Sequence, residues 1–322
     1  MANNKFIHLL LACTLLATAC DDNDAPADES KAYPAIIMAE AFDHGSVTGT
    51  TWYNGETIGV YMMKNGTDDI VAPYGNLLYY ANQFDNQDYF LPGDDELIPY
   101  FPATGEKMDI AAYYPRTTVL ADRLVALHLI NNYEYASQLL FARATGLSKD
   151  NRKAELALFP VLTKLTFKFK VGYGLTKDDL QGLSVTLQGL PVSGNFDATT
   201  GKIDFRNVAL DEELKLTTAE AAATRAGNDA ADNVVITAQG LVFPTSSTEG
   251  YKVKIELPAV GGGAGKTYEF EIKKATNEFE GSQEYTFTTT INNEELIVIV
   301  DKSPIAGWEP GGTINGDGEE SN

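Results

Sequence analysis

Hydrophobic and polar side chains alternate most regularly between residues 164 and 171 of this chain. Lysine or threonine stands at each even position, and leucine, phenylalanine or valine stands at each odd position. A period of two residues is that of a β-strand with one face in a core and the other in water. We therefore predict a strand within Leu156–Tyr173, and we interpret its upstream part, Leu156–Phe159, as a crossing between two domains.

Shorter apolar stretches recur along the rest of the chain, separated by Gly, Asn, Asp and Pro. This pattern is typical of many short strands joined by turns, and it predicts a nearly all-β fold. We also expect a short helix at Ala219–Arg225 inside an exposed loop, Asp211–Asn233, and a hairpin connection at Gly261–Gly265. The other expected strands are Tyr33–Phe42, Thr57–Met63, Asn76–Phe84, Met108–Tyr114, Ala136–Ala144, Leu183–Leu187, Gly194–Phe196, Lys202–Phe205, Val234–Ala238, Tyr251–Leu257, Tyr268–Lys273, Tyr285–Thr290 and Glu294–Val300.

Residues 1–19 have the pattern of a signal peptide. Lys5 precedes an apolar run, Phe6–Ala19, that ends in small residues directly before Cys20. The run is shorter than the roughly 20 residues that cross a hydrocarbon core. We predict cleavage between Ala19 and Cys20, a lipid on Cys20, and an acidic solvated tether at residues 20–32. The alternative is an ordinary signal peptide that leaves Cys20 without a lipid.

Composition narrows the classes of function. The 322 residues carry a formal net charge of −21, which disfavours nucleic acid as a partner because the phosphate backbone would be repelled. Cys13 leaves with the signal peptide and a lipid would occupy Cys20, so we expect no disulfide and no cysteine chemistry in the mature protein. The length predicts two domains, at residues 33–158 and 159–309, before a polar tail at 310–322.

Candidate catalytic residues are few. His44 and His128 are far apart in the sequence, and the acidic turns Asp94–Glu96 and Asp178–Asp179 would form a glycosidase pair only if they met across a cleft. The acidic loops lack the spacing of an EF-hand calcium loop. We therefore expect no enzyme activity, no metal site and no cofactor.

A binding protein is the alternative from another class. Trp52, Tyr53, Tyr79 and Tyr80 would stack on sugars if they were exposed, as in a surface glycan-binding lipoprotein of a nutrient-uptake system. Aromatic residues in an all-β protein more often lie in the core.

Five short motifs occur in a fixed order: Thr51–Met62, Tyr100–Pro102, Asp109–Pro115, Leu165–Phe169 and Ile305–Trp308. Their order, together with the lipidation pattern at Cys20, resembles the fimbrillin-like family, the subunits of Bacteroides-type fimbriae (type V pili). The resemblance spans almost the whole mature chain. It implies two tandem β-sandwich domains of Greek-key, transthyretin-like topology in a surface-exposed outer-membrane lipoprotein.

The resemblance also implies a function in fimbrial assembly by strand exchange, and through it in adhesion or biofilm formation. The implied partners are other fimbrial subunits, the outer membrane through the lipid anchor, and a receptor or glycan on a host or bacterial surface. Backbone hydrogen bonds would give the exchanged strand its affinity, and alternating apolar side chains its register.

By position in the family, the strand removed before assembly corresponds to Ala35–Phe42, and the terminal strand to Leu296–Val300. The implied residues are Ala35, Ile36, Ile37, Met38 and Phe42 at one end, and Leu296, Ile297, Val298, Ile299 and Val300 at the other. Family shaft subunits are typically cut after an arginine, yet no arginine occurs between Cys20 and Arg116. Either another protease processes this chain, or it stays lipidated as an anchor or accessory subunit.

Overall fold

A computed structural model describes residues 33–41, 52–53, 55–84, 87–93, 97–131, 133–205, 208, 210, 212–221, 234–259 and 265–304. The predicted signal peptide, Cys20, the acidic tether, Phe42, His44, Asp94–Glu96 and the polar tail lie outside the described residues.

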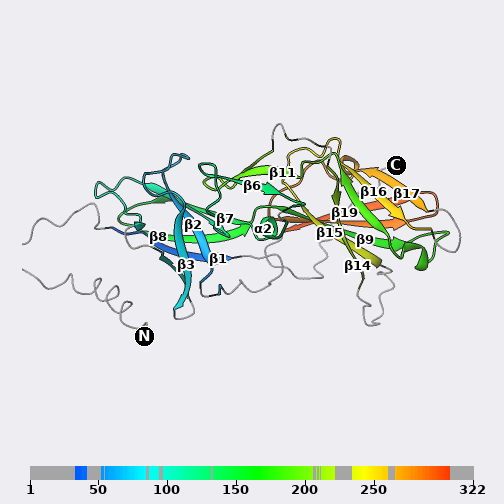
Figure 1. Cartoon of the computed structure of the whole chain (residues 1–322), viewed down its shortest axis with the longest axis horizontal. Coiled ribbons are helices and arrows are strands. Elements are labelled where there is room, and N and C mark those ends of the chain that lie inside the picture. The colour runs from blue at the N-terminus through cyan, green and yellow to red at the C-terminus, as the bar shows by residue number, and fades with distance from the viewer. Residues whose placement is uncertain are drawn as a thin grey trace, which may run out of the picture.

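Regular structure in the described part of the chain is nearly all β, which confirms the predicted fold class (Figure 1). One α-helix, α2, and two 3₁₀ turns, η4 and η5, accompany the strands. The elements are β1 (Ile36–Ala41), β2 (Thr57–Lys64), β3 (Leu77–Phe84), β4 (Gln87–Pro92), β5 (Met108–Tyr114), β6 (Leu124–His128), α2 (Tyr133–Ser137), β7 (Leu140–Leu147), β8 (Lys153–Pro160), β9 (Thr163–Val171), η4 (Asp178–Leu180), β10 (Ser184–Gln188), β11 (Ser193–Asp197), β12 (Ile203–Asp204), β13 (Leu214–Lys215), β14 (Thr217–Glu220), β15 (Val234–Val242), β16 (Lys252–Leu257), β17 (Lys266–Glu271), η5 (Ile272–Lys274), β18 (Gln283–Ile291) and β19 (Leu296–Pro304).

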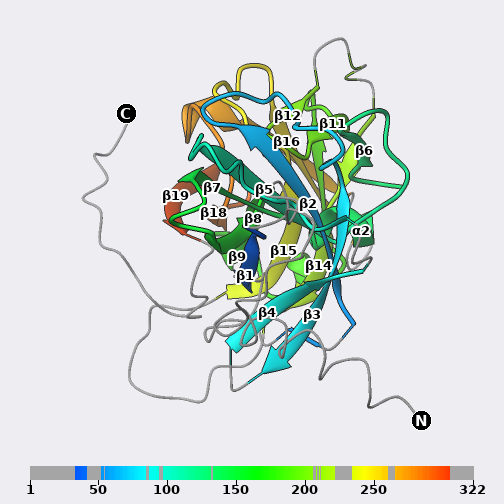
Figure 2. The same ribbon diagram turned by 90° about the vertical axis from the view of Figure 1, so that its left-hand side faces the viewer.

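The N-terminal strands form a closed barrel in the order β1-β4-β3-β2-β5-β7-β8. Figure 2 looks along the long axis of the molecule from the barrel end. The barrel encloses its own cluster of buried side chains, which includes Trp52, Ile58, Tyr79 and Phe101. Closure leaves each described barrel strand hydrogen-bonded on both sides, so these seven strands present no open sheet edge.

The C-terminal strands form two larger sheets at the other end of the molecule (Figure 1). One has the order β13-β10-β16-β17 and the other has the order β14-β15-β9-β18-β19. Their facing sides bury stacked aromatic rings, of which Phe167 and Phe287 have centroids 4.6 Å apart. The alternation that predicted β9 places Phe167 and Phe169 in this core and leaves Lys168 exposed.

A small sheet, β12-β11-β6, joins the two ends of the molecule. β6 precedes β7 in the sequence but pairs with β11, which lies beyond β9. One buried cluster therefore combines Tyr61 and Tyr113 of the barrel strands with Val125 of β6 and Phe196 of β11. The link between β8 and β9 consists of Val161 and Leu162, which are also buried.

Several predicted elements are wrong in detail. Ala136–Ala144 does not form one strand: Tyr133–Ser137 is helical and β7 begins at Leu140, because the run Ala-Ser-Gln-Leu-Leu has no period of two. The proposed crossing Leu156–Phe159 lies inside β8. Ala219, the first residue of the helix predicted at Ala219–Arg225, lies instead in strand β14, where it pairs with Thr237.

Candidate functional site

The predicted N-terminal exchange strand corresponds to β1, which forms part of the barrel wall. Ile36, Ile37 and Met38 lie in β1, and Ala35 directly precedes it. The inward side chains are small toward the C-terminal end of the strand: Ile37, Ala39 and Ala41 are buried, while Ile36 and Glu40 face out. The predicted strand Tyr33–Phe42 is confirmed over β1, and its side chains alternate between the barrel interior and the outside.

The two edges of β1 are held unequally. On one side β1 runs parallel to β8 and is paired over six residues, from Ile36 opposite Lys153 to Ala41 opposite Leu158. On the other side β1 runs antiparallel to β4 and is paired at two residues, Ile37 and Met38. The seam between β1 and β4 is therefore the shorter of the two seams that hold β1 in the barrel.

Trp52 lies against β1 directly after the β1–β4 pairing ends. Its indole Nε1 donates a hydrogen bond of 2.8 Å to the carbonyl oxygen of Ala39. Its ring also packs edge-on against Phe90 of β4, at 5.1 Å between centroids, and against Tyr114 of β5, at 5.2 Å. The small side chain of Ala39 and the large one of Trp52 thus fill the barrel together.

The predicted terminal strand corresponds to β19, at one end of the five-stranded sheet. It pairs with β18 over nine residues, from Leu296 opposite Ile291 to Pro304 opposite Gln283. No described strand pairs with its other edge. An unpaired edge of this kind can hydrogen-bond a further strand.

Both faces of β19 carry apolar side chains. Leu296, Val298 and Val300 pack against the core. Ile297 and Ile299 point outward and are 51% and 60% exposed. An open strand edge with exposed apolar side chains beside it is favourable for pairing with a further strand.

A buried ion pair fixes the turn after β2 to the barrel wall. Asp109 of β5 is fully buried, and its carboxylate accepts hydrogen bonds from Arg143 (2.8 Å), Asn65 (2.7 Å) and the N–H groups of Gly66 and Gly146 (3.0 Å each). Burial alone would raise the pKa of this carboxyl, but these four donors hold the pKa below its ordinary value. The sequence gives no sign of this pair, since its partners are 34 positions apart.

The candidate catalytic residues that lie in the described ranges, His128 and Asp178–Asp179, belong to different elements, β6 and η4. Asp179 of η4 accepts hydrogen bonds of 2.7 Å from the N–H and hydroxyl of Thr176, which precedes that turn. His128 lies on β6, with Nε2 3.4 Å from Glu212. Among the described residues, no three His, Cys, Asp or Glu side chains are grouped to hold a metal ion.

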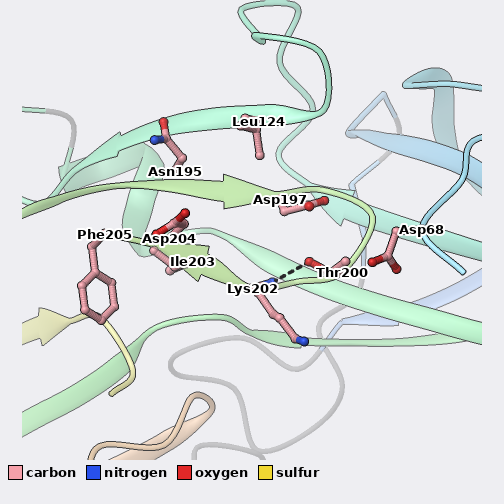
Figure 3. Close-up of a pocket in the computed structure, with 9 residues that line it drawn as sticks. All are labelled: Asp68, Leu124, Asn195, Asp197, Thr200, Lys202, Ile203, Asp204 and Phe205. Atoms are coloured by element: carbon pink, nitrogen blue, oxygen red, sulfur yellow. Dashed lines mark hydrogen bonds between the residues drawn. The ribbon is translucent and has the colours of Figure 1, made fainter. Parts of the chain in front are cut away.

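A hollow of about 480 Å³ lies beside the β11–β12 hairpin (Figure 3). Its acidic residues already have partners: Asp197 accepts a hydrogen bond of 3.0 Å from Arg123, and Asp68 accepts one of 3.0 Å from Arg143. Arg123 also donates a hydrogen bond of 3.0 Å to the carbonyl oxygen of Asp68, and this contact ties the small sheet to the turn after β2. None of the helices in the described ranges is long and apolar enough to span a membrane.

The four aromatic residues considered for glycan stacking do not form one exposed surface. Trp52 and Tyr79 lie in the barrel core, 4% and 2% exposed, so that part of the alternative is wrong. Tyr53 and Tyr80 are exposed. Two of the four aromatic residues therefore lie in the core and two lie on the surface.

The described residues thus form an all-β protein with an N-terminal strand closed into a barrel and a C-terminal strand at the open edge of a sheet. The sequence pattern of the fimbrillin-like family matches residues 46–308, and the chain belongs to this family. A comparison with curated proteins found no match.

Solved structures share the fold. The chain is similar to a candidate cell adhesion protein from Bacteroides uniformis, with 23% sequence identity and a TM-score of 0.60 over 87% of this chain and 100% of that chain. It is also similar to one from Bacteroides ovatus, with 20% identity and a TM-score of 0.56 over 87% of this chain and 100% of that chain. Similarity at this level of identity establishes the architecture.

Proposed function

We propose that this protein is a structural or accessory subunit of a cell-surface fimbria that assembles by exchange of β-strands and contributes to adhesion or biofilm formation. Membership of the fimbrillin-like family supports the fimbrial role and the cell-surface location. The observation that carries the strand-exchange part is the position of β1, an N-terminal strand that closes a barrel through one long and one short seam.

Removal of β1 would convert the closed barrel into a sheet with a gap. The edges of β8 and β4 would lose their partner, and the space now filled by Ile37, Ala39 and Ala41 would be open to solvent. Unpaired backbone groups beside an apolar groove bind an extended strand whose alternate side chains fit the groove. An incoming strand would need a small side chain where β1 has Ala39, because Trp52 fills the barrel at that point.

β19 is the proposed donor or closing strand at the other end of the chain. β19 is long enough to take the place of β1 beside β8, because β19 pairs with β18 over nine residues and β1 pairs with β8 over six. The outward row of Ile297 and Ile299 is complementary to an apolar groove. A strand that already pairs with β18 could add a neighbour at its open edge without leaving its sheet.

The anchoring of the subunit belongs to the same proposal. A lipid on Cys20 would hold the chain at the outer membrane, with residues 20–32 as spacer and residues 33–158 and 159–309 as the two domains. The absence of arginine between Cys20 and Arg116 favours a chain that keeps its lipid, as an anchor or accessory subunit would. Intact mass and N-terminal mapping of the protein from native cells separate the two fates: an acylated Cys20 indicates an anchor, and a new N-terminus after β1 indicates a processed shaft subunit.

Strand exchange itself is tested with two truncations of the soluble mature chain. One lacks residues 20–41 and therefore β1, and the matched control lacks residues 20–32 and keeps β1. We expect polymers, by size-exclusion chromatography and electron microscopy, from the first protein and monomers from the second. Equal behaviour of the two proteins would reject β1 as the strand that blocks assembly.

A peptide with the sequence of residues 33–41 provides the complementary experiment. It should bind the chain that lacks β1 and stop its polymerisation, because it restores the missing seams. The same peptide with Ala39→Lys should not bind, since a charged side chain would enter the buried space next to Trp52.

A further inference from the structure

The turn after β2 contains a pair of residues, Asn65 and Gly66, that can react with each other. Asn-Gly pairs occur three times in the sequence, and this is the pair of which the structure describes both residues. Glycine after asparagine favours attack of its backbone nitrogen on the asparagine side chain, because no Cβ stands in the way. Both residues of the pair are exposed, so water reaches them. The pair is therefore a candidate site for deamidation.

Deamidation at this pair needs no enzyme and no reactant other than water. The nitrogen of Gly66 gives its proton to a base in the solvent and bonds to Cγ of Asn65. The bond from Cγ to the side-chain nitrogen breaks, and this nitrogen leaves as ammonia after taking up a proton. Water then adds to the five-membered imide and opens it to aspartate or isoaspartate. The reaction thus begins with loss of the proton on the Gly66 nitrogen.

Asp109 of β5 holds both of the groups that would react. Its Oδ2 accepts a hydrogen bond of 3.0 Å from the N–H group of Gly66, and its Oδ1 accepts one of 2.7 Å from Nδ2 of Asn65. The pKa of Asp109 lies below its ordinary value, so this carboxylate is charged at neutral pH. A negative charge beside the N–H group opposes loss of the proton, because the resulting nitrogen anion would face the carboxylate.

The rest of the network fixes the turn in its present geometry. The N–H group of Thr67 donates a hydrogen bond of 3.1 Å to the carbonyl oxygen of Lys64. Arg143 donates one of 2.6 Å to the carbonyl oxygen of Thr67 and one of 2.8 Å to Asp109. Ring closure brings Cγ of Asn65 into bonding distance of the Gly66 nitrogen. Both groups must leave their hydrogen bonds to Asp109 for this to happen.

We propose that Asn65 is a latent deamidation site and that the buried carboxylate of Asp109 keeps it unreactive in the folded chain. Both residues of the pair have a structural role: Gly66 adopts a φ of +73°, which favours glycine, and Asn65 donates to Asp109. Deamidation would replace this donor with a second carboxylate, and two like charges would then face each other at a buried position. The turn after β2 would lose its attachment to the barrel wall. The inference does not depend on fimbrial assembly.

Peptide mapping by mass spectrometry measures the reaction directly. The full mature chain and a free peptide with the sequence of residues 61–70 are incubated at neutral pH and physiological temperature. Aspartate and isoaspartate at position 65 are then quantified over time. We expect Asn65 to react more slowly in the folded chain than in the peptide, by at least an order of magnitude. Equal rates in the chain and the peptide would overturn the proposal.

Asp109→Asn tests the carboxylate itself, since it keeps the shape of the side chain and removes its charge. Val298→Lys, which weakens the C-terminal core and leaves the turn after β2 unaltered, is the matched control for a general loss of stability. We expect Asp109→Asn to accelerate deamidation of Asn65 several-fold and Val298→Lys to leave the rate unchanged. An unchanged rate in Asp109→Asn, or equal acceleration in both variants, would overturn the proposal.

Amide hydrogen exchange in the unaltered chain needs no variant. Base-catalysed exchange begins with loss of the N–H proton, which is also the first step of deamidation. Gly66 lies in an exposed turn, and so does Gly250, whose N–H group donates to none of the described residues. We expect the N–H group of Gly66 to exchange more slowly than that of Gly250, by at least an order of magnitude. Exchange of the two groups at the same rate would overturn the proposal, even if Asp109→Asn did not fold.

Discussion

Asp109→Asn is the substitution with the best-defined expected cost. It keeps the shape of the side chain but removes the negative charge that faces Arg143 at 2.8 Å in a fully buried position. An amide also cannot accept at both terminal atoms, so at least two of the donors Arg143, Asn65, Gly66 and Gly146 lose their acceptor. Breaking a buried pair by removing one partner typically costs about 3–5 kcal/mol.

That cost is large beside a total stability of about 5–15 kcal/mol for a typical domain. It corresponds to roughly two to four powers of ten in the unfolding equilibrium constant. Guanidinium denaturation followed by far-ultraviolet circular dichroism measures the difference. Asp68→Asn is the matched control: Asp68 accepts from the same Arg143 at 3.0 Å but is 47% exposed, and we expect a cost below about 1 kcal/mol.

The pH dependence of stability tests the same reasoning. Since the folded-state pKa of Asp109 is lowered, its contribution is present above the unfolded-state pKa of about 3.9 and is lost as the pH falls toward the folded-state value. Asp109→Asn should therefore flatten the acid limb of the stability curve relative to Asp68→Asn. Equal losses for the two variants at neutral pH, or an unchanged acid limb, would show that burial and the four donors do not set the strength of this pair.

Three further predictions concern Gly201, Trp52 and the two faces of β19. Gly201→Ala would place a Cβ 2.4 Å from Phe141 at a φ of +72°, so it should lose more than about 1 kcal/mol beyond Gly250→Ala, where φ is +83° and no atom lies within 4 Å, in parallel thermal melts. Trp52→Phe removes the hydrogen bond to Ala39 and should accelerate hydrogen exchange in β1 at a cost of about 1–3 kcal/mol, while unchanged exchange would mean that the indole does not hold the strand. Ile299→Lys on the outer face of β19 should change monomer stability by less than about 0.5 kcal/mol, whereas Val298→Lys on the inner face should cost at least about 2 kcal/mol. If β19 exchanges or pairs between subunits, Ile299→Lys should still reduce polymer yield, which size-exclusion chromatography of the β1-deleted chain measures.

The strands that the sequence predicts well are those with one clear core face. β9 and β18 have alternating residues over nearly their whole length and lie at the centre of the five-stranded sheet. β6 carries the same signal, with Val125 and Leu127 buried between exposed or half-exposed residues, but it is short and its partner β11 is far along the chain. The four residues of β14 are all exposed, so backbone pairing with β15 rather than a hydrophobic pattern defines that strand.

The candidate sites also divide into those that the sequence predicts and those that it does not. The strands β1 and β19 can be predicted from their apolar stretches, but the sequence does not show which row of β19 faces the core, because residues 296–300 are all apolar. The unequal seams of β1 cannot be predicted, since they depend on where β4 and β8 end. The Asp109–Arg143 pair cannot be predicted either, because it arises from tertiary packing between distant segments.

The two-residue connection between β8 and β9 determines how easily the two ends of the molecule bend against each other. Val161 and Leu162 are 8% and 0% exposed, and hydrogen bonds of 3.0 Å to Leu139 and 3.2 Å from Ser282 fix their backbone. A two-residue connection that is buried and bonded on both sides cannot act as a hinge. Bending one end of the molecule against the other would require opening packed core, so the subunit behaves as a stiff rod of constant length that transmits tension and torque instead of absorbing them.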